Sequence, residues 1–222
     1  MRSAETPRSA SVSAMSSERV TTAKAESHVF RSMPSRVLAR AGDLIFPASA
    51  AQALQMTMPY CKSLTTLRFW NASLSTRALT VLCEGLKGSA VTRLHVDYNP
   101  LPPDLGEEGG LVYSLMLAPS SPLQLLSLRG NRLCDEVCGE LMRTLSTNKN
   151  LLALDLWDNE LSDGCAADVV RMLCTNPNLQ SLNLSRNRLA SGAGRALSLA
   201  FAAANVPDRE EAKTMKKAGY KI

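Results

Sequence analysis

The sequence predicts an α/β fold, a right-handed solenoid with parallel strands on its concave face and helices on its convex face. The first observation is an apolar phrase that occurs five times, with copies starting at Leu64, Val91, Leu123, Leu151 and Leu179. The second is the spacing of 27 to 32 residues between copies, which is typical of stacked repeats. The third is a helical apolar pattern that follows the copies. One copy cannot bury its apolar face alone, so neighbouring copies must stack.

Each copy begins with a short strand. Leu126-Ser-Leu128 and Leu154-Asp-Leu156 alternate apolar and polar residues, which is the period of a strand with one buried face. In four copies an asparagine follows three residues after the last strand apolar: Asn99, Asn131, Asn159 and Asn187. We expect these side-chain amides to bond backbone groups where the chain leaves the sheet. The first copy has Ala72 at this place, so its turn should be looser.

Helices are expected after the turns. Ser75, Asp135 and Asp163 stand before helical apolar patterns and are the expected N-caps. A helix of about fourteen residues per repeat predicts a strongly curved horseshoe. The second copy differs, because prolines and glycines over Pro102–Gly110 predict a loop and leave only Leu111 to Leu117 for a short helix. This insertion is either a binding feature or neutral.

The pattern Leu-x-x-Leu-x-Leu-x-x-Asn-x-Leu followed by a capped helix resembles the ribonuclease-inhibitor-like subfamily of leucine-rich repeats. The resemblance covers Leu64 to about Phe201 and is nearly complete in the last three copies. That subfamily includes inhibitors, receptor domains, a GTPase activator and ciliary scaffolds. The resemblance therefore implies a leucine-rich-repeat horseshoe and a binding role, and it does not name the ligand.

The predicted domain organisation is one solenoid over residues 43–204 between two tails. Residues 43–63 form its N-terminal cap, the repeats start at 64, 91, 123, 151 and 179, and residues 205–222 form a basic C-terminal tail. Residues 1–42 form a basic, Ser/Arg-rich N-terminal tail that we expect to be disordered. The formal charge of +5 belongs to the tails, since residues 43–204 carry 13 basic and 14 acidic side chains.

The segments around the repeats point to the cytoplasm. No stretch approaches the roughly 18 consecutive apolar residues of a membrane span, and the chain starts without a secretory apolar core. An Arg- and Ser-rich start is similar to a mitochondrial presequence, but Glu5, Glu18 and Glu26 argue against one. With no export signal, the six cysteines are expected to be reduced.

The residues give little support for metal binding, cofactor binding or catalysis. Cys134 and Cys138 are four apart on a helix, but no second pair of ligands completes a zinc site, so we expect no metal. There is no glycine-rich phosphate loop, so we expect no cofactor. His95 and Asp97 share a face with Ser127, but nothing activates that serine, and we expect no catalytic residues and no enzyme activity. The tails have almost no aromatic residues to stack on bases, which argues against nucleic acid.

The concave face is the predicted binding surface. Strand residues that point away from the core form three columns across the repeats, and both tryptophans stand in the middle column. Aromatic and arginine side chains are typical of interface hot spots. The predicted partner-binding residues are Arg68, Trp70, His95, Asp97, Tyr98, Arg129, Asp155, Trp157, Asp158 and Arg186. The alternative is that Trp70 packs under the cap or a folded tail.

These observations predict a non-enzymatic scaffold or adaptor that binds another protein in a cytoplasmic, cytoskeletal or ciliary/flagellar assembly. The last repeat has no sixth strand after it, so its uncovered face would favour an end-on contact with another subunit. The alternative function is a GTPase activator resembling the Ran activating protein. Such activators are larger arrays with a strongly acidic tail, and this chain departs from both features.

Overall fold

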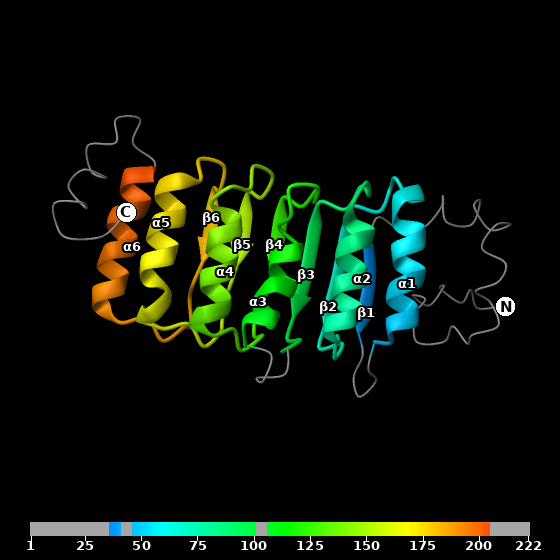
Figure 1. Cartoon of the computed structure of the whole chain (residues 1–222), viewed down its shortest axis with the longest axis horizontal. Coiled ribbons are helices and arrows are strands. Elements are labelled where there is room, and N and C mark those ends of the chain that lie inside the picture. The colour runs from blue at the N-terminus through cyan, green and yellow to red at the C-terminus, as the bar shows by residue number, and fades with distance from the viewer. Residues whose placement is uncertain (1–35, 41–45, 101–105, 205–222) are drawn as a thin grey trace, which may run out of the picture.

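The protein has two layers, a parallel sheet and a row of helices on one side of it (Figure 1). The computed structural model describes residues 36–40, 46–100 and 106–204. Its six strands lie side by side in chain order: β1 (Arg36–Arg40), β2 (Thr66–Trp70), β3 (Arg93–Asp97), β4 (Leu125–Ser127), β5 (Ala153–Asp155) and β6 (Ser181–Asn183). The helices are α1 (Ala48–Thr57), α2 (Thr76–Leu86), α3 (Gly106–Leu115), α4 (Asp135–Leu145), α5 (Ala166–Thr175) and α6 (Ser191–Ala204), with 3₁₀ turns at Met58–Tyr60 and Asp163–Cys165. The predicted α/β solenoid is confirmed.

The core lies between the two layers. The central leucines of the strands are in register, from Leu67 through Leu94, Leu126 and Leu154 to Leu182. All except Leu182 are buried. At the N-terminal end Phe46 packs edge-on against Phe69, with ring centroids 5.2 Å apart. Stacking therefore buries what single strands could not.

The asparagines form a ladder beneath the turns. The Oδ1 atoms of Asn99, Asn131, Asn159 and Asn187 accept hydrogen bonds from backbone N–H groups of the preceding repeat, at 2.6 to 3.2 Å. Asn159 also donates through Nδ2 to the carbonyls of Leu128 and Leu156. The predicted role of these amides is confirmed, and the bonds join successive repeats as well as serving each turn.

The solenoid begins earlier than the sequence predicted. β1 (Arg36–Arg40) lies in the segment that was assigned to a disordered tail, and it pairs in parallel with β2. Together with α1 it supplies a strand and a helix ahead of the first predicted repeat, so α1 of the predicted cap is the helix of a further strand–helix unit. Backbone pairing with an existing strand stabilises β1, and this pairing depends on β2 rather than on local pattern. Residues 1–35 and 205–222 lie outside the described part.

The second repeat keeps its helix, which corrects the prediction of a loop over Pro102–Gly110. α3 begins at Gly106, although glycine disfavours helix by about 1 kcal/mol per residue relative to alanine. A Cβ at Gly110 would stand 3.0 Å from Cγ of Glu140 and 3.5 Å from Cα of Val137. Glycine therefore allows α3 to pack closely on α4, and this packing overrides propensity. The rest of the insertion, residues 101–105, is outside the described part.

Two of the three expected N-caps have another role. Ser75 caps α2 by accepting a hydrogen bond from the Ala78 N–H at 3.2 Å. Asp135 and Asp163 instead accept backbone N–H groups of the next repeat, from Ser162 and Ala190 respectively, both at 2.7 Å. In a solenoid the following turn lies against each helix start, so these carboxylates connect repeats. Five of the six helices also have 10 or 11 residues rather than about fourteen.

Among the described residues, none of the helices has the length and apolar character that a membrane crossing requires.

Candidate partner-binding face

The register of the sheet places the predicted residues on its open face. Arg68, His95, Ser127, Asp155 and Asn183 are paired in one continuous row across β2 to β6. A second row begins where Trp70 pairs with Asp97, and it continues through Arg129, Trp157 and Ser185. Their neighbours along each strand are the apolar residues of the core, because side chains alternate between the two faces. The columns predicted from the sequence are therefore those of the structure.

The third row has a backbone conformation that the sequence did not reveal. Asn71, Tyr98, Gly130, Asp158 and Arg186 all lie in the left-handed region, with φ between 46° and 62°. Each stands directly before the residue that forms the asparagine ladder or its Ala72 equivalent. The left-handed residue reverses the chain so that the next side chain can turn inward. Side chains of this row are thereby held at the end of the strands.

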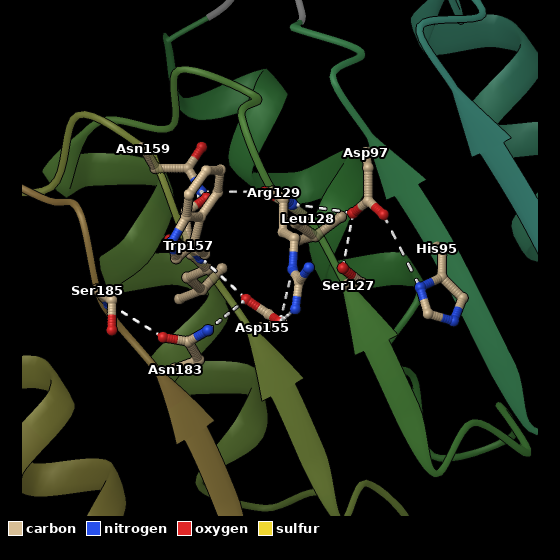
Figure 2. Close-up of polar contacts among 11 residues, drawn as sticks. His95, Asp97, Ser127, Leu128, Arg129, Asp155, Trp157, Asn159, Asn183 and Ser185 are labelled. Carbon is tan, nitrogen blue, oxygen red and sulfur yellow. Dashed lines mark hydrogen bonds and ion pairs between the residues drawn. The ribbon is translucent and has the colours of Figure 1, made fainter.

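Hydrogen bonds connect the open face of the sheet from β3 to β6, as Figure 2 shows. Asp97 Oδ1 accepts from the Ser127 hydroxyl at 2.6 Å and from the Arg129 N–H at 3.1 Å. Arg129 then donates through Nε to Asp155 Oδ2 at 2.7 Å. Asp155 Oδ1 accepts from the Asn183 amide at 3.1 Å. The carboxylates are thus held by neighbouring strands, while the arginine remains half exposed.

The environment of His95 keeps it neutral. Burial lowers its pKa, the positive charge of Arg68 lowers it further, and Asp97 opposes both effects. The Nδ1 atom of His95 lies 3.8 Å from Asp97 Oδ2, beyond a hydrogen bond. Neutral His95 therefore adds no positive charge to this face near neutral pH.

The Ser127–Asp97–His95 arrangement is unsuited to nucleophilic catalysis. Ser127 donates to the carboxylate, and the histidine approaches the other oxygen of that carboxylate, so His95 does not receive the serine proton. Only 3% of Ser127 is exposed, which leaves little of it accessible to a substrate. In the described residues no group of three or more His, Cys, Asp or Glu side chains is arranged to hold a metal ion.

Aromatic rings lie along the same face. Trp70 is 50% exposed, and its ring meets Tyr98 edge-on with centroids 5.8 Å apart. Trp157 is half-buried, and the Arg186 guanidinium lies over its ring, 5.0 Å from the centroid. A cation above an aromatic face is attracted by the ring quadrupole, which holds both side chains in place. The alternative in which a folded tail covers Trp70 concerns residues 1–35, which lie outside the described part.

A groove follows the ends of the strands, and its volume is about 530 Å³. We call it the rim groove. It is lined by third-row residues, which precede the ladder asparagines, and by residues that follow those asparagines. The third-row residues are Asn71, Tyr98, Gly130, Asp158 and Arg186, the following residues are Pro100, Arg132, Glu160 and Arg188, and Asn159 completes the lining.

The structure groups the ten predicted residues unevenly. His95, Asp97, Arg129 and Asp155 lie in the polar network. Trp70 and Tyr98 form an aromatic pair, and Trp157 and Arg186 form a cation–π pair. Asp158 lines the rim groove, and Arg68 is exposed at the N-terminal end of the face. The groove also includes Arg132, Glu160 and Arg188, which are not among the predicted residues. Their common signal was available, since each directly follows a ladder asparagine.

Comparison with known proteins supports the repeat and the fold. A model of the leucine-rich repeat family matches residues 178–198. The tropomodulin C-terminal domain from Caenorhabditis elegans is similar in structure, with a TM-score of 0.54 and 14% identity over 76% of this chain and 98% of that domain. A leiomodin-1 domain described as actin-binding site 2 has a TM-score of 0.37 and 14% identity over 77% of this chain and 92% of that domain. No curated protein sequence matches the chain significantly. At this identity the tropomodulin likeness extends to the fold alone.

Proposed function

We propose that this protein is a non-enzymatic scaffold that binds another protein through the concave face of its sheet. The observation that carries the proposal is the row of aromatic and arginine side chains held outward across the repeats. Trp70, Tyr98 and Trp157 present ring surface, while Arg129 and Arg186 present guanidinium groups. Such side chains account for most of the binding energy in protein interfaces.

The rigidity of the face supports a binding role. Asp97 and Asp155 bond to groups on neighbouring strands, so the side chains between them are held before a partner arrives. Binding then costs less conformational entropy than it would on a mobile surface. The same bonds leave the carboxylates largely satisfied, which supports a surface for recognition rather than proton transfer.

The presence of a helix in every repeat supports the assignment of the repeats to the ribonuclease-inhibitor-like subfamily.

Proximity labelling with the full-length protein in its own cells would test the proposal. The wild type is compared with a Trp70→Ala/Trp157→Ala variant. A dominant set of labelled neighbours that the variant loses is the expected result, because two central aromatic anchors are removed from a surface whose fold rests on other residues. Purified filamentous actin in a co-sedimentation assay would serve as one defined cytoskeletal ligand.

A matched control removes exposed apolar side chains elsewhere. Tyr60→Ala/Leu111→Ala is suitable, because Tyr60 and Leu111 are 84% and 57% exposed and both lie outside the concave rows. This variant should keep the neighbours of the wild type. Thermal melts of both variants would show that the array is intact. If the tryptophan variant keeps the same neighbours, the partner does not bind this face.

A cytoskeletal or ciliary/flagellar setting is part of the proposal, and so is an end-on subunit contact at the last repeat. Leu182, Leu184 and Leu189 in that repeat are only partly buried. A subunit docked there would protect these side chains, and sedimentation of the purified protein at increasing concentration would detect self-association through this end.

A further inference from the structure

We propose that the rim groove binds an acidic peptide segment in which single carboxylates are separated by neutral residues. The inference rests on the proposed function, because it takes the partner to be a protein held on the strand side of the array. It adds the chemical class of that partner and the place where its charged side chains bind.

The repeat itself builds the groove. The asparagine of each turn points inward, so the residues before and after it stand on two sides of a trough across neighbouring repeats. Asn159 contributes to the lining and is buried beneath it. Because the asparagine ladder anchors every turn, the groove keeps its shape without a ligand.

Gly130 contributes no side chain to the middle of the groove. Its φ is 62°, and a Cβ there would stand 2.5 Å from two carbons of the Tyr98 ring. The ring therefore occupies the space over this glycine, and position 130 itself adds no side chain to the groove. A peptide can therefore approach the Tyr98 ring and the backbone at this position, beside Arg132.

Two arginines give the groove its preference for carboxylates. Among the residues that the structure describes, no carboxylate lies within ion-pair distance of Arg132 or Arg186. Arg186 is held over Trp157, and Arg132 is exposed. Arg188, by contrast, is paired with Glu160 at 3.5 Å. A guanidinium without an ion partner offers the planar donor pair that fits a carboxylate.

The acidic residues of the groove select a peptide over nucleic acid. Asp158 and Glu160 lie between the positions of Arg132 and Arg186 along the repeats. A phosphate backbone carries a charge at every nucleotide and would bring phosphates close to both acids. A peptide with spaced carboxylates can contact the arginines and place neutral residues against the acids. The near balance of 13 basic and 14 acidic side chains over residues 43–204 is also unlike a nucleic-acid surface.

Fluorescence anisotropy with the full-length protein tests this assignment. The probe is a short labelled peptide that carries one tyrosine and glutamates separated by neutral residues. The same peptide with glutamine in place of every glutamate, and a single-stranded oligonucleotide, are the comparison ligands. We expect the acidic peptide to bind best, to weaken with salt, and to lose on the order of tenfold in affinity in an Arg132→Gln/Arg186→Gln variant.

The matched control is Arg143→Gln/Arg171→Gln. It removes the same charge from α4 and α5, away from the groove. This control should bind the acidic peptide as the wild type does. Equal affinity for the acidic and glutamine peptides would overturn the inference, and so would equal losses in the two double variants. Tighter binding of the oligonucleotide that disappears in the groove variant would assign the groove to nucleic acid and overturn it too.

The experiments distinguish a failure of the proposed function from a failure of the groove assignment. If the Trp70/Trp157 variant loses its cellular neighbours while the Arg132/Arg186 variant keeps them, the concave face binds a partner and the groove assignment is wrong. If the tryptophan variant keeps its neighbours, the proposed function fails first, whatever the peptide does.

Discussion

The fourth and fifth predicted repeats carry the same motif but differ in burial. Leu154 and Leu156 on the fourth are 1% and 0% exposed, whereas their equivalents Leu182 and Leu184 on the fifth are only partly buried. The fourth repeat has a neighbour on each side in the sheet, and β6 of the fifth has β5 on one side only among the described strands. The burial of a leucine in this protein therefore depends on whether a neighbouring repeat packs against it, and not on the sequence motif alone.

The largest expected effect comes from truncating the paired leucines. Leu154→Ala should cost about 2–5 kcal/mol of unfolding free energy, because it leaves a cavity between fully packed layers. Leu182→Ala should cost at most about 2 kcal/mol, since that side chain retains contact with water. Urea unfolding followed by circular dichroism measures both. Equal losses would show that the fifth repeat is as closed as the fourth.

The asparagine ladder provides a second comparison between the fourth and fifth repeats. Asn159→Ala should cost about 1–3 kcal/mol, since it leaves the buried Asn131 N–H and Leu128 carbonyl without their partner. Asn187 makes equivalent bonds to the preceding repeat but is partly exposed, so water can replace some of them. Asn187→Ala should therefore cost less. Thermal denaturation of the two variants measures both losses of stability. A larger loss for Asn187→Ala than for Asn159→Ala would contradict this expectation.

The pH dependence of stability tests how far His95 is shielded from solvent on the open face of the sheet. Burial and Arg68 lower its pKa, so the unfolded chain binds the proton more readily than the folded one. Stability should therefore be fully present above the ordinary histidine pKa of about 6.5 and fall as the pH drops through it. The difference in Tm between wild type and His95→Gln, followed from about pH 7 to pH 5, isolates this contribution. A difference that stays constant with pH would mean that His95 is solvated.

The smallest expected effect is a difference in local opening that thiol labelling can detect. Burial raises the pKa of Cys83 to about 12, so this thiol stays neutral and unreactive in the folded array. Cys174 on α5, next to the fifth repeat, is only partly buried. Mass spectrometry after brief alkylation at mildly alkaline pH should find Cys174 modified before Cys83. Modification of both only upon global unfolding would mean that the C-terminal end does not open separately.

Local patterns predicted much of the architecture. Leu126 and Leu154 occur at the two-residue period of a strand, and the asparagines mark every turn from Asn99 onward. Because side chains on a strand alternate, this period also placed Trp70 and Trp157 on the open face. Neither inference required knowledge of a neighbouring repeat.

Other features depend on residues that are distant in sequence. β1 exists through its pairing with β2, and α3 starts at Gly106 because Gly110 fits against α4. The sequence placed Ser127 beside His95 but could not show that its hydroxyl bonds to Asp97. The rim groove likewise appears only when the turns of several repeats lie side by side.

The sequence by itself determined the repeat, the strands of its five copies, their turns from Asn99 onward, and which side chains leave the core, because periodicity is a property of neighbours along the chain. Only the tertiary structure decided which carboxylate meets which donor, how exposed each leucine is, and which arginines lie apart from the carboxylates of the described residues. These properties depend on distances between residues in different repeats, about 30 positions apart, and stacking sets those distances.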